Sequence, residues 1–348
     1  MRLSRYIMQV IVLRLIVLHA VISVRYLAQA APLTAVIPSF PIRFQWEHGH
    51  GYCGELSIQQ TALTHGVWVG QQQARDTGTG ELLLGYPSTK QNNLERVVKA
   101  LGFEYVTWDP DSEINQVKPT SYMRWVKQQI IAGRAVVFGA RLEGGEDDEW
   151  YDHIMPAYGV SYDSVTAGQY DARDRLLWTD DFGNLANKSM LDPSFFAAQY
   201  KCQMPEDTFI GCIPTGAPTF ATAMGGLHDS NNLLLPIRLI MSGWSDGSNP
   251  AREPIVKTHT VSARYRLAFK PSAKVKPGQR ISIYRCDRSA NGSGGLPPNP
   301  TSGSQLTRAG CRSWSFTMGA STPSQLSHRT LGVLRSNSVV YFVAVLQR

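Results

Sequence analysis

Cys53 has the sequence surroundings of a catalytic nucleophile. It lies in the glycine-rich stretch Gly49-His50-Gly51-Tyr52-Cys53-Gly54, directly before a segment with helical spacing that ends at Gly66. We therefore expect Cys53 in the first turn of a helix, where unpaired amide groups and the helix dipole favour a thiolate. A thiolate can attack a carbonyl carbon, and the side-chain amide of Gln45 could donate to the resulting oxyanion. A half-cystine or a buried structural thiol is the alternative.

This pattern resembles the papain-like cysteine peptidases, and residues 51–59 are most similar to their C39-like branch. In those families a histidine on a later strand and an aspartate or asparagine after the next strand complete the site. Residues 152–160 of this chain match the histidine strand. Residues 176–183 match the strand that ends in Asp or Asn, followed by an aromatic residue and glycine. The resemblance covers about residues 43–200.

The resemblance implies a Cys53–His153–Asp180 triad with Gln45 at the oxyanion, and Asp181 as the near competitor of Asp180. His153 would take the thiol proton, and the aspartate would orient the imidazole ring. Two features depart from the family pattern. Gln45 is further from Cys53 than the usual spacing, and Glu55 stands where proline often follows Cys-Gly.

Charge divides the chain into three segments. Residues 1–30 carry four arginines and no acidic residue. Residues 31–229 hold 14 Lys and Arg against 24 Asp and Glu, a net charge of −10. Residues 230–348 hold 16 against 3, a net charge of +13. Such a contrast predicts two structural units that meet near residue 230.

Residues 1–30 have the organisation of a secretory signal. Arg2 and Arg5 form a basic start, residues 7–24 are mostly apolar, and Ala28-Gln29-Ala30 is a small-residue cleavage site. We expect a cleaved signal and a secreted protein with no stable membrane insertion. An uncleaved N-terminal membrane anchor is the alternative.

The cysteine count agrees with export. There are five cysteines, and with Cys53 kept as a free thiol the others form two local pairs, Cys202–Cys212 and Cys286–Cys311. An even number of cysteines beside one free thiol is expected in an oxidising compartment.

The order of elements predicts an α+β papain-like domain over residues 31–228, with helices first and strands later. Helices are expected at 93–100, 119–132 and 191–200, a strand at 135–140, and a loop at 67–85. From residue 236 to 348, apolar or alternating runs separated by turns predict a small β-sandwich. These runs are 237–242, 258–270, 280–286, 313–317 and 339–346.

The sequence leaves three functions from different classes open. A secreted cysteine peptidase acting on peptides or proteins, without a cofactor, is the first. The second is a thiol amidase or acyltransferase. The third is an inactive papain-like scaffold with a basic binding domain.

His48, His50 and Cys53 could supply metal ligands, but no second cluster completes such a site, and we expect no metal. The basic C-terminal segment lacks the interleaved aromatics of a nucleic-acid groove, so docking on the acidic domain or on an anionic surface is expected instead, with a plain solvated face as the alternative.

Overall fold

A computed structural model of the chain combines helices with antiparallel sheets, in agreement with the expected α+β class. The predicted signal (1–30), the predicted pair Cys202–Cys212 and residues 192–200 of a predicted helix lie outside the residues that the structure describes. Those described residues are 33–38, 40–43, 45, 51–78, 93–108, 119–143, 150–163, 167–171, 173–179, 188–191, 221–228, 239–242, 260–261, 266–269, 278–289, 306–307, 310–317, 326–327, 334–335 and 338–346. Among them no helix is both long enough and apolar enough to span a bilayer.

The larger sheet has seven strands in the order β3-β8-β4-β5-β6-β7, and β1 also pairs with β5. Its strands are β1 (Leu33–Val36), β3 (Phe103–Thr107), β4 (Ala135–Glu143), β5 (Trp150–Tyr162), β6 (Arg175–Thr179), β7 (Lys188–Leu191) and β8 (Ala221–Leu227). The long strand β5 pairs with β4, β6 and β1 and is a central strand of this sheet.

Two of the predicted helices are confirmed to within one residue. α4 covers Asn93–Ala100, and α5 covers Pro119–Ile131. Proline at the first position of α5 is favourable, because its missing N–H has no partner there anyway. Gly133 follows the helix with φ of 81°, a left-handed conformation that glycine adopts without strain.

The predicted loop at 67–85 is wrong over its first part. β2 (Val67–Val69) and α3 (Gln71–Thr77) lie there. The three glutamines that open α3 are all buried, so this helix has no apolar stripe for sequence periodicity to detect. Strands β3, β7 and β8 also have no counterpart in the sequence-based expectation.

Helices cover both faces of the larger sheet. Val136 and Phe138 of β4 pack in one apolar cluster with the buried residues of α5. Val137, between them, packs in another cluster with Cys53 and Ile58 of α2 (Cys53–Leu63). Because side chains alternate along a strand, α5 and α2 lie on opposite faces of the sheet.

The C-terminal strands form separate antiparallel sheets. One sheet has the order β13-β12-β16-β2, a second the order β14-β11-β9, and a third pairs β10 with β15. The strands are β9 (Leu239–Ser242), β10 (Thr260–Val261), β11 (Arg266–Phe269), β12 (Arg280–Ser289), β13 (Arg312–Thr317), β14 (Leu326–Ser327), β15 (Leu334–Arg335) and β16 (Ser338–Leu346). Each of the five predicted runs contains a strand. Their arrangement as a sandwich stays a prediction.

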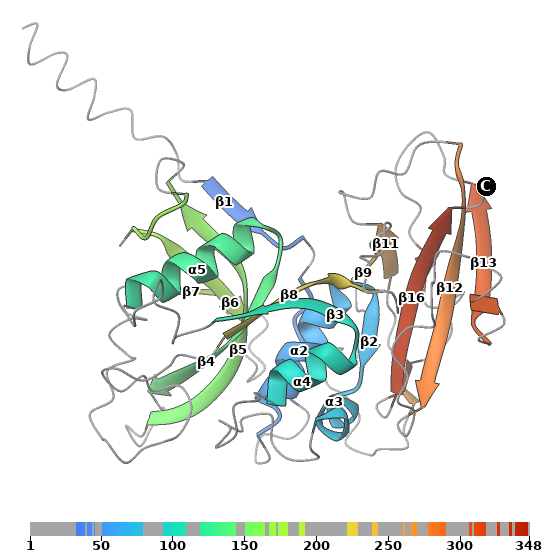
Figure 1. Ribbon diagram of the computed structural model, residues 1–348, viewed down its shortest axis with the longest axis horizontal. Coiled ribbons are helices and arrows are strands. Elements are labelled where there is room, and N and C mark those ends of the chain that lie inside the picture. The colour runs from blue at the N-terminus through green and yellow to red at the C-terminus, as the bar shows by residue number, and fades with distance from the viewer. Residues whose placement is uncertain are drawn as a thin grey trace, which may run out of the picture.

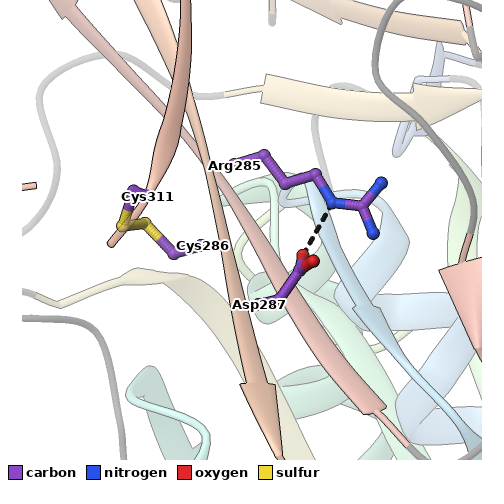
Figure 2. Close-up of a disulfide and its surroundings, with 4 residues drawn as sticks. All are labelled: Arg285, Cys286, Asp287 and Cys311. Atoms are coloured by element: carbon purple, nitrogen blue, oxygen red, sulfur yellow. Dashed lines mark hydrogen bonds and ion pairs between the residues drawn. A yellow bond between two sulfur atoms is a disulfide. The ribbon is translucent and has the colours of Figure 1, made fainter. Parts of the chain in front are cut away.

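The disulfide Cys286–Cys311 is confirmed, with an S–S distance of 2.05 Å (Figure 2). On the same strand, Arg285 Nε lies 2.6 Å from Asp287 Oδ1, and Arg312 reaches the other carboxylate oxygen of Asp287 at 3.4 Å. Asp287 is one of only three acidic residues after residue 230, and it therefore offsets part of a strongly basic segment.

The sheet of the C-terminal strands also includes a strand from the N-terminal part. β2 pairs with β16 through Val67–Tyr341 and Val69–Val339. Next to this pairing, the Phe342 amide donates to the Gly66 carbonyl at 3.0 Å. The predicted division near residue 230 therefore does not separate two self-contained sheets.

Helix α2 lies between the two large sheets (Figure 1). All eleven of its residues are buried. The cluster around Cys53 and Ile58 takes in side chains from the β5 side and from the C-terminal sheet, among them Ile154, Tyr284, Val339, Tyr341 and Val343. A helix enclosed in this way must satisfy its polar side chains internally, and Gln59 does so by donating to the Val69 carbonyl at 2.8 Å.

Gly159 in β5 lies close to both β6 and β1. A Cβ there would lie 2.8 Å from Leu177 Cδ1 and 3.2 Å from the Ala35 carbonyl oxygen. We expect Gly159→Ala to lower the free energy of unfolding by about 1–3 kcal/mol, because neither neighbouring strand can move away freely. The control is Gly168→Ala, where no atom of the described residues lies within 4 Å of the added carbon. Equal denaturation midpoints for the two variants would contradict this expectation.

Candidate active site

Cys53 is the first residue of α2, as the sequence predicts. The chain enters the helix through Gly51, whose φ of 60° favours glycine, and through Tyr52, and no side chain of the described residues caps the first turn. Cys53 is a free cysteine, and it is only 2% exposed. The prediction of an unpaired thiol at the start of a helix is confirmed.

Strand β5 passes the first turn of α2 at the residue that follows His153. The Ser57 hydroxyl lies 2.8 Å from the Cys53 carbonyl oxygen and 3.1 Å from the Ile154 carbonyl oxygen, and it donates toward both. Ile154 shares the apolar cluster of Cys53, whereas Met155 packs in the cluster of α5. The backbone of His153 lies in β5 opposite Ala140, and its side chain is outside the described part.

Strand β6 brings the residue before Asp180 to the same helix. Thr179 is the last residue of β6, and its hydroxyl donates to Gln60 Oε1 of α2 at 3.2 Å. β6 also pairs directly with β5, with Trp178 opposite Ala157. Asp180 and its competitor Asp181 lie outside the described residues, so their place at the site stays a prediction.

Gln45 lies in a segment that runs along α2. Arg43, two residues earlier, donates from Nε to Gln59 Oε1 at 3.2 Å, and its carbonyl accepts from Gln60 at 3.4 Å. Gln45 is buried, with 4% of its surface exposed, and within the described part of the chain its Oε1 atom has no hydrogen-bond partner. Its predicted role at the oxyanion stays a prediction.

A buried ion pair next to Cys53 was missed by sequence analysis. Glu55 is fully buried, and its Oε1 atom lies 2.6 Å from Arg75 Nε. Arg75 also donates from Nη2 to the Gly51 carbonyl at 2.9 Å, and its guanidinium lies 3.4 Å from the centre of the Tyr52 ring. A glutamate in the first turn of a buried helix was one available signal, because a buried charge requires a partner. The partner, however, lies in the segment that the sequence predicts as a loop.

The described geometry brings together the three chain segments that carry the predicted site. The helix that begins at the free Cys53 contacts β5 at the residue after His153, through Ser57, and the end of β6 at the residue before Asp180, through Gln60. Within the same described residues, no group of three His, Cys, Asp or Glu side chains is placed to hold a metal ion. Such an arrangement suits nucleophilic catalysis by the thiol. No family model, curated protein or solved structure matches this chain.

Proposed function

We propose that this protein is a secreted cysteine peptidase with a papain-like, C39-like catalytic domain. The observation that carries the proposal is that Cys53 is a free cysteine at the N-terminus of a helix, and the Ser57 hydroxyl ties this first turn to the backbone of β5 at Ile154. The free thiol at the first position of α2 gives the proposal its nucleophile. The disulfide Cys286–Cys311 supports export, because such bonds persist in oxidising compartments.

In the proposed reaction, His153 takes the proton of the Cys53 thiol, and the thiolate attacks the carbonyl carbon of a peptide bond. The Cys53 amide and the Gln45 side chain donate to the oxyanion, and Asp180 orients the imidazole. His153 then gives its proton to the leaving amine as the C–N bond breaks, which leaves a thioester on Cys53. Water, deprotonated by His153, hydrolyses the thioester and restores the free thiol.

The test is covalent labelling of the secreted protein with iodoacetamide and with a peptidyl chloromethyl ketone, followed by mass mapping. We expect the folded protein to be modified at Cys53, and a peptide library to be cleaved by the wild type and not by Cys53→Ala. Cleavage by Cys53→Ala at the wild-type rate would overturn the assignment of the nucleophile. Cys286 and Cys311 are internal controls: they form a disulfide, so neither should be labelled.

One observation favours an alternative. The Cys53 side chain is only 2% exposed and belongs to the apolar core cluster, as expected for a structural thiol in an inactive scaffold. Failure of both reagents to label Cys53 in the folded protein, with full labelling after denaturation, would support the scaffold. Labelling without peptide cleavage would instead support an amidase or acyltransferase acting on a non-peptide amide.

A further inference from the structure

We propose that Glu55 and Arg75 form a clamp that fixes the turn before Cys53, and that Arg75 is a positioning residue for the thiol. The catalytic consequence of this inference rests on the function proposed above. The clamp itself rests on contacts with the two residues that precede Cys53 in the chain.

Arg75 makes three different contacts with one short stretch of chain. Its Nε atom lies 2.6 Å from the Glu55 carboxylate, which belongs to the first turn of α2. Its Nη2 atom donates to the Gly51 carbonyl at 2.9 Å, and its planar group covers the Tyr52 ring at 3.4 Å. The guanidinium therefore holds the residues on both sides of Cys53 at the same time. Its fork of donors and its flat face are both used, which a lysine ammonium cannot reproduce.

The turn is held from a second direction by the same helix. The Tyr52 hydroxyl donates to Gln72 Oε1 at 2.6 Å, and Gln72 Nε2 donates in turn to Asp76 Oδ1 at 2.7 Å. Gln72, Arg75 and Asp76 all belong to α3. α3 is therefore the support on which the Gly51–Tyr52 turn rests.

The support is anchored to the C-terminal sheet. Gly70, the residue before α3, accepts from the Ala74 amide at 2.8 Å and donates to the Ser338 carbonyl at 3.2 Å. Ser338 begins β16, which pairs with β2 immediately upstream of Gly70. The position of the thiol is thus connected through α3 to the last strand of the chain.

A role in positioning explains why a charge pair is used here. A buried ion pair adds little stability compared with apolar side chains, because desolvation of both charges offsets their attraction. It does impose a single geometry, since both partners must remain aligned. The clamp therefore serves to fix the direction in which Cys53 faces β5.

The experiment compares Arg75→Lys with Arg134→Lys. Arg134 is the control, because it also bonds a glutamate, Glu104 at 2.7 Å, in a partly exposed pair outside the site. Arg75→Lys keeps a positive charge beside Glu55 and loses the Gly51 bond and the stacking on Tyr52. Hydrogen exchange of the peptide that covers residues 51–56 should become about tenfold faster in Arg75→Lys and remain unchanged in Arg134→Lys. Turnover of a peptide substrate should fall by about 10- to 100-fold, with KM nearly constant.

A double variant, Glu55→Gln with Arg75→Gln, removes both buried charges and tests the inference if Arg75→Lys fails to fold. We expect it to fold and to remain slow in turnover of the peptide substrate. Recovery of wild-type turnover in the double variant would show a purely structural role and overturn the inference. Unchanged exchange at 51–56 in Arg75→Lys would overturn the clamp itself. If the wild-type thiol is inert to labelling, the proposed function fails, and the exchange data still decide whether the clamp exists.

Discussion

Replacing His153 with alanine is expected to slow both alkylation of Cys53 at neutral pH and peptide hydrolysis by about 10²–10⁴-fold. Without the imidazole, the proposed site has no group to take the thiol proton and none to protonate the leaving amine. The fold should remain intact, because the β4–β5 pairing at this position uses the backbone of His153 and not its side chain. Single-turnover labelling and steady-state cleavage, measured from pH 5 to pH 9, would separate the two roles.

His228→Ala is the matched control for this prediction. His228 is a partly exposed histidine at the end of the larger sheet, and its amide bonds the Gly102 carbonyl at 2.8 Å. We expect its replacement to leave labelling and turnover close to those of the wild type. If His153→Ala labels at the wild-type rate, the proposed base is wrong and the inactive scaffold becomes the better hypothesis.

A chain that ends at residue 228 is expected not to fold into a stable unit. Such a truncation removes β16 and leaves β2 without the strand with which it pairs. It also removes Tyr284, Tyr341 and the other apolar side chains that cover α2 from the side of the C-terminal sheet. This face of α2 would then be exposed to water, which would compete for the hydrogen bonds of its buried glutamines, threonine and glutamate. The apolar cluster around Cys53 would also lose part of its side chains.

The measurement is a comparison of residues 31–228 with residues 31–348, each expressed for export. We expect the shorter chain to aggregate or to show no cooperative unfolding, and the longer one to unfold in a single transition. A soluble, cooperatively unfolding 31–228 fragment would show that the N-terminal part is a self-sufficient domain. In that case the β2–β16 pairing would be an accessory contact.

Local sequence signals were enough to predict the start of α2. A glycine-rich approach, followed by Leu56, Gln59, Gln60 and Leu63 at turn spacing, places Cys53 in the first turn of a helix without knowledge of its neighbours. The same holds for α5, which begins at a proline and ends before a glycine. Cysteine parity predicted the Cys286–Cys311 bond, because with Cys53 set aside the other four cysteines divide into two pairs that are close in the sequence.

Contacts between distant segments were beyond this kind of prediction. The three residues of β2 are too short a run to indicate a strand, and they form one only because β16 offers a partner. The partner of Glu55 is Arg75, which lies 20 residues later in the chain. The residue types alone do not predict the buried Glu55–Arg75 pair, since most glutamates and arginines are on the surface.

The enclosure of α2 has a consequence for the order in which the molecule is made. The Tyr341 hydroxyl donates to the Leu101 carbonyl, 240 residues earlier in the chain. At typical synthesis rates, the interval between these two residues is on the order of ten seconds to a minute. During that time the wall formed by β16 does not yet exist, and the support of the Gly51–Tyr52 turn has no anchor at Ser338. In a nascent chain, therefore, α2 has no cover on this side and the Gly51–Tyr52 turn has no anchor at Ser338 until the last strand has been added.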